Sequence, residues 1–179
     1  VSVVVLDGFD GLRVDDIRVL DMAWREGKGC VIAVNKWDLV KGVDQGHYLV
    51  ALQRRLPMVR FVPIRFISAL KRSNVQAVLK DAQTVWSRLG RRIPTPEVNR
   101  IVRQIKDARK APVGSNHRTV TVYYMTQVSV NPVSFVVFVN NRAAVSDQFS
   151  RYLENLVRER FDLKGVPLMI SFRDREHRP

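Results

Sequence analysis

Two short polar segments of this sequence follow strand-like apolar runs and carry side chains suited to recognising a purine base. The first is Asn35-Lys36-Trp37-Asp38, directly after the run CVIAV. A carboxylate such as that of Asp38 can accept two hydrogen bonds side by side, and guanine offers two adjacent donors, its ring N–H and its exocyclic amine. The aliphatic stem of Lys36 can lie on the face of the base, and Asn35 can brace the loop and touch the base. The segment predicts a guanine site, with an ordinary polar turn as the alternative.

Adenine would place an acceptor opposite the same carboxylate, and sites built on such pairing can reject the wrong partner by roughly 10⁴-fold. The second segment, Ser68-Ala69-Leu70-Lys71, strengthens the prediction because it follows the next strand-like run. The backbone N–H of Ala69 can donate to the guanine carbonyl, where adenine carries an amine. Ser68 and Ala69 are small enough to let the base approach, and we interpret Lys71 as a solvated charge.

These segments must be positioned by the elements of residues 1–90, in which strand-like and helix-like patterns alternate. The β-branched run VSVVVL lacks polar alternation, which is typical of a strand covered on both faces. This part alternates strand and helix three times, an order that implies right-handed crossovers and a parallel sheet. Ligand sites in such sheets lie off the carboxyl ends of the strands. The predicted strands are 1–6, 30–34 and 61–68, and the predicted helices are 14–27, 43–56 and 73–90.

The pattern changes after the basic, proline-containing stretch GRRIPTPEV. Apolar periodicity then predicts the order α-β-β-α-β, which suggests a small α+β domain with its helices on one face of a three-stranded sheet. We therefore divide the chain into an α/β part at 1–90, a linker at 91–96 and an α+β domain at 97–179. The predicted helices of the second part are 95–110 and 145–161, and the predicted strands are 118–128, 134–141 and 166–173.

The composition and net charge of the chain say more about its binding partners than about its fold. The chain has 179 residues, of which 46% are apolar and 26% charged, and its sequence contains no apolar run of about 18 residues, so we expect no membrane span. Its one cysteine, Cys30, excludes a disulfide framework and fits a small core position. A net charge of +13 favours nucleic acid as partner, ahead of an anionic membrane surface or a merely solvated basic surface.

The first part of the chain resembles the last two nucleotide motifs of Ras-like and Era-like GTPases. In both, a strand leads into NKxD, and after a helix a further strand leads into SA. Within these, the segments VVVLDGFDGLRVDD, VIAVNKWDLV, RRIPTPEVNRIV and RYLENLVRERFDLKGVPLMISFR are similar to the EngA/Der family. That family joins two consecutive G domains to a C-terminal KH-like domain. The resemblance implies that 1–90 is the C-terminal part of a GTPase (G) domain with a partial P-loop-NTPase-type sheet, and that 97–179 is a KH-like domain.

The resemblance also implies a function, a GTP-binding factor for assembly of the large ribosomal subunit. Its guanine-binding residues would be Asn35, Lys36, Asp38, Ser68 and Ala69, and its ligands GTP or GDP with Mg²⁺. The implied partners are the large-subunit precursor with its rRNA and ribosomal proteins, with no membrane involved. The implied location is the bacterial cytoplasm, or alternatively the mitochondrial or chloroplast matrix.

The sequence departs from the GTPase pattern, since GxxxxGK[ST] does not occur in it. We expect the phosphate-binding, metal-binding and catalytic motifs to precede Val1 in a longer protein, which leaves no catalytic residue or metal ligand here. The alternative is a GTP-independent RNA-binding assembly module with a degenerate G domain. A third interpretation is a protein-interaction scaffold.

Contact with RNA would also differ from that of most KH domains, because the GxxG clamp is missing from residues 90–179. Neutralisation of phosphates by Lys and Arg would then carry the contact. The candidate residues are Arg91, Arg92, Arg100, Arg103, Lys106, Arg109, Lys110 and Arg118.

Overall fold

The computed structural model describes residues 1–107 and 120–175, which form two compact units. The first unit contains Val1–Leu89 together with Lys164–Pro167, and the second contains Gly90–Leu163 and the residues from Leu168 onward. The sequence-based division places all of 97–179 in one domain. The structure differs at Lys164–Pro167, because the backbone of this short segment is hydrogen-bonded within the first unit.

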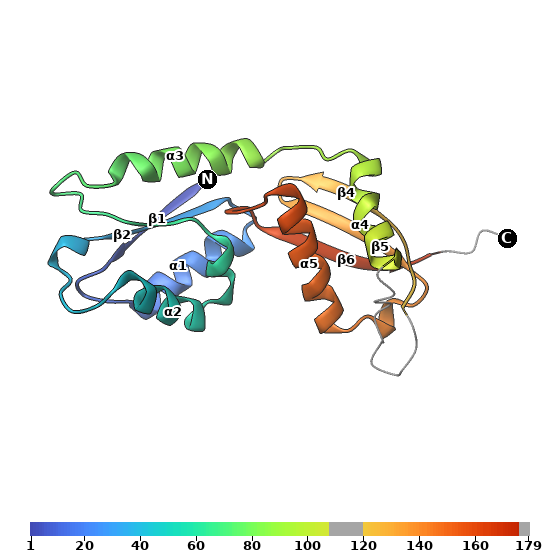
Figure 1. The fold of residues 1–179 in the computed structure, drawn as a ribbon, viewed down its shortest axis with the longest axis horizontal. Coiled ribbons are helices and arrows are strands. Elements are labelled where there is room, and N and C mark those ends of the chain that lie inside the picture. Colours follow the sequence, from blue (N-terminus) through green and yellow to red (C-terminus); the bar gives the residue numbers. More distant parts are fainter. Residues whose placement is uncertain (108–119, 176–179) are drawn as a thin grey trace. The chain divides into compact units, whose positions relative to one another are not determined.

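The first unit is a three-layer α/β arrangement around a parallel sheet (Figure 1). The strand order is β1-β2-β3, and the register pairs Ser2 with Cys30 and Ile32 with Ile64. Helix α3 covers one face of the sheet, while α1 and α2 lie on the other (Figure 1). The strands are β1 (Ser2–Asp7), β2 (Cys30–Asn35) and β3 (Ile64–Phe66), and the helices are α1 (Val14–Arg25), α2 (Gln45–Arg55) and α3 (Val75–Arg88).

This unit confirms the predicted alternation of strands and helices and the parallel sheet. The central strand β2 is buried over its whole apolar run, as expected for a strand covered on both faces. Strand β3 is shorter than the predicted 61–68, since it covers only Ile64–Phe66, and Phe61 belongs instead to the 3₁₀ helix Pro57–Phe61. Proline suits the first turn of such a helix, since its fixed φ is helical and its missing N–H would have no partner there.

The second unit contains the predicted order α-β-β-α-β around a mixed three-stranded sheet. Strands β4 and β5 form an antiparallel hairpin that turns at Asn131–Pro132, and β6 pairs with β5 in parallel. The hydroxyl of Ser146 caps α5 by accepting the Phe149 N–H at 3.2 Å. The strands are β4 (Val122–Val130), β5 (Val133–Val139) and β6 (Leu168–Asp174), and the helices are α4 (Thr95–Asp107) and α5 (Asp147–Phe161).

Helix α4 shows the amphipathic pattern that the sequence predicts for it. Val98, Ile101, Val102 and Ile105 are buried, so the apolar stripe faces the interior of the second unit. In the described ranges, no helix is both long and apolar enough to cross a membrane.

Candidate guanine site

The candidate site begins where β2 ends. Asn35 is the last residue of β2, Lys36 adopts a left-handed conformation with φ 59°, and Trp37–Leu39 forms a 3₁₀ turn. The N–H of Trp37 donates to the carbonyl oxygen of Ile67 at 3.1 Å, and the N–H of Ile67 donates to the carbonyl oxygen of Val34 at 2.8 Å. These bonds tie the Asn35–Asp38 loop to the chain that leaves β3, as expected for loops at the carboxyl edge of a parallel sheet.

An aromatic cluster anchors the Asn35–Asp38 loop to the core of the first unit. The ring of Trp37 packs against Phe66 with centroids 4.3 Å apart and edge-on against Tyr48 at 5.6 Å. Trp37 and Tyr48 both pack against the apolar core of the first unit. Sequence reasoning gave Trp37 no role, although a large apolar side chain within a polar turn is a signal that the turn is fastened to a core.

Asn35 connects the two loops directly. Its side-chain oxygen accepts the backbone N–H of Ala69 at 2.9 Å. The sequence predicts that the Ala69 amide donates to the guanine carbonyl, whereas in this structure the amide donates to Asn35. The bond fixes the distance between the two segments that we expect to contact the base.

The carboxylate of Asp38 is the most shielded charged group of the site, with only 14% of its side chain exposed. A hydrogen bond from the Ser68 hydroxyl is the main cause that lowers the pKa of Asp38, and Lys71 lowers it further. The ammonium of Lys71 lies 3.4 Å from Asp38 Oδ2, and the Lys71 N–H donates to the Ser68 hydroxyl at 3.1 Å. Asp38 is therefore an ionised acceptor at neutral pH, held by the segment that follows β3.

Lys36 points toward the end of β1. Its ammonium lies 2.6 Å from Asp7 Oδ2, and the hydrogen bond between them is the main cause that lowers the pKa of Asp7. Gly8 also contacts the loop, since its N–H donates to the Asn35 carbonyl oxygen at 2.8 Å. A Cβ atom at Gly8 would lie 2.9 Å from that oxygen, so a glycine is required for this close approach.

The structure thus brings the five residues predicted to bind guanine into one cluster. Lys71, which the sequence analysis interprets as a solvated charge, also belongs to this cluster, because its ammonium pairs with Asp38. Within the described residues, no group of three His, Cys, Asp or Glu side chains could hold a metal ion. The cluster is suited to holding a base and contains no described metal site.

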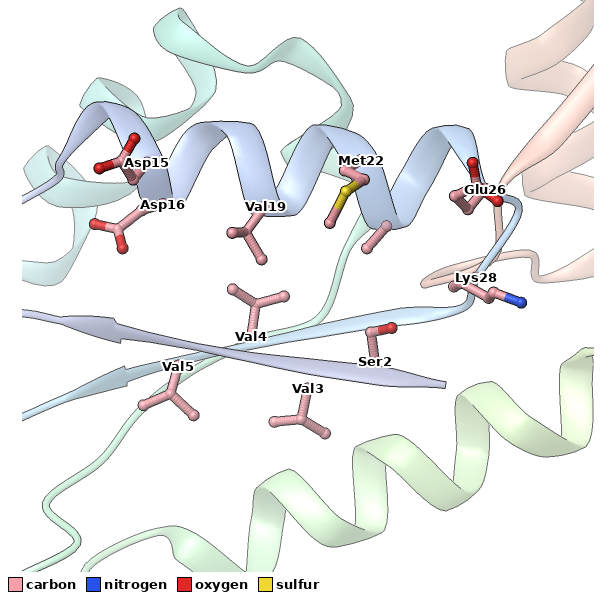
Figure 2. A pocket seen from close by; sticks show the side chains of 11 residues that line it. Ser2, Val3, Val4, Val5, Asp15, Asp16, Val19, Met22, Glu26 and Lys28 are labelled. Carbon is pink, nitrogen blue, oxygen red and sulfur yellow. The ribbon is translucent and has the colours of Figure 1, made fainter.

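The edge of β1 forms an apolar groove on the same unit (Figure 2). Val3 and Val5 point to the α3 side of the sheet and are 41% and 57% exposed. Val4 points to the other side, toward Val19 and Met22 of α1. An exposed edge strand with apolar side chains on both faces is a surface that another strand can cover.

Basic side chains are exposed on the second unit and on the segment that leads into it. Five of the predicted RNA-contact residues are described, and all five are exposed, whereas the other three, Arg109, Lys110 and Arg118, lie outside the described residues. On α4, the basic positions alternate with the buried apolar stripe, so the charges face solvent. The exposed residues are Arg91, Arg92, Arg100, Arg103 and Lys106.

Comparison with known proteins links both units to one family. Residues 92–173 match the KH-domain-like family of EngA bacterial GTPase enzymes, C-terminal. Proteins called GTPase Der are 37% identical in Desulforudis audaxviator over 98% of this chain and 33% in Trichlorobacter lovleyi over 99%. The GTPase Der of Rickettsia akari is 32% identical over 95% of the chain. The chain spans about 40% of the length of these relatives. By these matches, the chain belongs to the EngA/Der family.

Proposed function

We propose that this chain is part of a GTP-binding factor that acts in assembly of the large ribosomal subunit. The observation that carries the proposal is the position of the Asp38 carboxylate, shielded, ionised and adjacent to the Ser68–Ala69 segment. Such a carboxylate can accept the ring N–H and the exocyclic amine of guanine together. The relatives named above, called GTPase Der, support the choice of a GTP-hydrolysing protein.

GTP hydrolysis by the full-length protein also requires elements that hold the phosphates and Mg²⁺. We propose that these elements are supplied by a segment that adds a strand to the edge of β1, where Val3 and Val5 are exposed (Figure 2). Asp7 and Gly8 end this strand and contact the guanine loop through Lys36 and Asn35. A strand paired there would end beside the base site, which is where phosphates joined to the base must lie.

The second unit would carry the contact with RNA. Five exposed cations on α4 and its preceding segment, together with the net charge of +13, suit the neutralisation of phosphates. Residues 92–173 match a KH-domain-like family, and KH modules bind RNA, so we propose rRNA of the large-subunit precursor as the target and ribosomal proteins as further partners. The relatives named above come from bacteria, which favours the bacterial cytoplasm over an organellar matrix.

The test is competition of GDP and ADP for the nucleotide site of the full-length protein. We expect the wild type to prefer GDP and Asp38→Asn to lose most of that preference, because the amide would place a donor against a guanine donor. Asp147→Asn is the matched control, since Asp147 is an exposed residue of α5 in the second unit and should leave the preference unchanged. Equal binding of GDP and ADP by the wild type would contradict the proposal.

The alternative is a GTP-independent RNA-binding module, in which the exposed cations of α4 and its preceding segment would carry the function. Its signature would be rRNA binding by a full-length protein that binds neither nucleotide. A scaffold that contacts only proteins would instead bind rRNA weakly and without dependence on salt.

A further inference from the structure

We propose that one face of the sheet in the second unit binds unpaired bases of RNA by stacking, with Tyr124 as the main contact. This inference rests on the proposed function, because it names the kind of RNA that the second unit would recognise. The contact would be separate from the cations of α4, which suit the phosphates of any RNA. Its ligand would be single-stranded RNA, since the bases of a duplex are already stacked on one another.

The sheet of the second unit has two unlike faces. On one face, Val133, Phe135 and Val137 of β5 are at most 1% exposed, and Phe149 of α5 packs against Phe172 of β6 at 6.2 Å between ring centroids. Side chains alternate along a strand, so the residues between these point to the opposite face. We call that opposite face the open face, and its two central rows are Tyr124–Phe138–Arg173 and Thr126–Val136–Ser171.

The first row carries a short aromatic stack that crosses two strands. The register pairs Tyr124 of β4 with Phe138 of β5, and their rings are stacked with centroids 4.3 Å apart and planes 15° apart. Tyr124 lies on an edge strand of the sheet and is 41% exposed. A flat base can therefore extend the stack from Tyr124. Exposed aromatic side chains on a sheet are a known means of holding unpaired RNA bases.

The charge of the open face suits RNA. Arg173 of β6 is exposed opposite Phe138, so its guanidinium can neutralise a phosphate beside a stacked base. The one acidic residue of β4, β5 and β6 is Asp174, which follows Arg173 and belongs to the other face. Its carboxylate accepts the Arg142 N–H at 2.6 Å. The strands thus present a cation and no carboxylate on the open face.

The second row offers hydrogen bonds more than apolar surface. Thr126 and Ser171 stand on either side of Val136, which is only 5% exposed. The Ser171 hydroxyl donates to the Phe135 carbonyl oxygen at 3.4 Å, and its lone pairs can still accept. Hydroxyl groups can pair with base edges and with the 2′-OH of ribose. Rings beside hydroxyls and a cation favour RNA as the occupant over an apolar protein surface.

The competing role for Tyr124 is structural, in which its ring only shields the sheet. The two roles predict different results for Tyr124→Leu, which keeps an apolar side chain but removes the flat ring. A shielding role predicts unchanged RNA binding, whereas a stacking role predicts weaker binding. Tyr124→Phe keeps the ring and should bind RNA as the wild type does.

The experiment measures the affinity of the full-length protein for two single-stranded probes, oligoadenylate of about ten nucleotides and an abasic oligomer with the same number of phosphates. We expect the wild type to bind oligoadenylate more tightly than the abasic oligomer. Tyr124→Leu should weaken oligoadenylate binding roughly tenfold and leave abasic binding unchanged. Because tyrosine carries no charge, the slope of log affinity against log salt should not change.

Val128→Ala is the matched control, because Val128 is an apolar residue of the same strand, 54% exposed, and has no ring. It should leave both affinities unchanged. Equal oligoadenylate binding by Tyr124→Leu and the wild type would overturn the inference and leave the open face to a protein partner, while salt-dependent binding of both probes still supported the proposed RNA contact. An equal loss for both probes would also overturn it, because the ring would then not act on bases. A wild type that binds neither probe would contradict the inference and the proposed RNA contact together.

Discussion

The side-chain oxygen of Asn35 accepts the backbone N–H of Ala69 at 2.9 Å, and this one bond joins the two loops that we assign to guanine binding. The loops follow different strands, β2 and β3, and each is also fixed by its own backbone contacts. Asn35 therefore acts as a spacer that holds Asp38 and Ala69 at a set separation. A site built in this way is arranged before a base arrives, which lowers the cost of ordering on binding.

Replacing Asn35 tests this spacer. In Asn35→Ala the Ala69 amide loses its acceptor, so we expect faster hydrogen exchange at that amide, by roughly fivefold for a bond of about 1 kcal/mol. Asn35→Asp is the matched control, since it keeps a side-chain oxygen for the same bond and should retain protection. Exchange can be followed by NMR on this chain. Equal protection of the Ala69 amide in the wild type and Asn35→Ala would contradict the assignment.

Gly165 is expected to be essential for the first unit. It adopts φ +83°, its N–H donates to the Phe61 carbonyl oxygen at 2.6 Å, and its own carbonyl oxygen accepts the Cys30 N–H at 2.8 Å. A Cβ atom there would collide with the Val85 side chain. We expect Gly165→Ala to lower the free energy of unfolding by about 3 kcal/mol, through strain and collision together.

Gly42 provides the control, because it also has a positive φ, +72°, and a Cβ atom there would meet nothing within 4 Å. Gly42→Ala should therefore cost only about 1 kcal/mol from backbone strain. Urea unfolding followed by tryptophan fluorescence suits the comparison, since Trp24, Trp37 and Trp86 all belong to the first unit. Similar losses for the two variants would show that the contacts of Gly165 do not support this unit.

The buried thiol of Cys30 should make the free energy of unfolding depend on pH in the alkaline range. The thiol is fully buried, and burial raises its pKa from 9.0 to about 11. The folded state holds this proton more tightly than the unfolded state, so the contribution is complete below pH 9 and is lost as pH rises toward 11. We expect the stability difference between the wild type and Cys30→Ala to shrink by about 2 kcal/mol from pH 8 to 10.5.

Tyrosines and lysines also titrate in this range, and the comparison with Cys30→Ala removes their contribution, because they are common to both proteins. Fluorescence-detected urea unfolding at each pH gives the two stability curves. Parallel curves would mean that the thiol is not shielded from water as the structure indicates.

Arg100 and Arg103 lie on the exposed side of α4 and test the proposed contact with RNA. If each neutralises a phosphate, substitution by Gln should reduce the slope of log affinity against log salt by about 0.7 to 1 per residue. Arg18→Gln on α1 is the control, because Arg18 is similarly exposed but belongs to the first unit. Binding of rRNA at several salt concentrations provides the slopes. Identical slopes for Arg103→Gln and the wild type would exclude this residue from the contact.

The alternation of elements could be predicted because local patterns determine it. The unbroken apolar run of β2 indicates a strand covered on both faces, and the stripe of α4 indicates a helix with one buried side. The order of these elements was sufficient to place Asp38 and Ser68 at the same edge of a parallel sheet. The type and order of the elements were therefore accessible without coordinates.

The particular contacts could not be predicted, because they depend on side-chain positions that no periodicity encodes. The pairing of Lys71 with Asp38 joins residues on different loops, and an exposed lysine by itself resembles any solvated charge. Lys164–Pro167 is hydrogen-bonded within the first unit although it lies far along the chain, in a stretch without a distinctive pattern. The short extent of β3, Ile64–Phe66, could not be predicted from the apolar run at 61–68 either.

The central claim, that Asp38 recognises guanine, is tested most directly by changing the base to match a changed residue. Xanthine carries a carbonyl at position 2 in place of the amine, so an amide at residue 38 can donate to it while accepting the ring N–H. The measurement is the affinity of full-length wild type and Asp38→Asn for GDP and for xanthosine diphosphate. We predict that Asp38→Asn loses at least about a hundredfold in GDP affinity and binds xanthosine diphosphate more tightly than the wild type does. Unchanged GDP affinity in Asp38→Asn, with no gain for xanthosine diphosphate, would contradict the account.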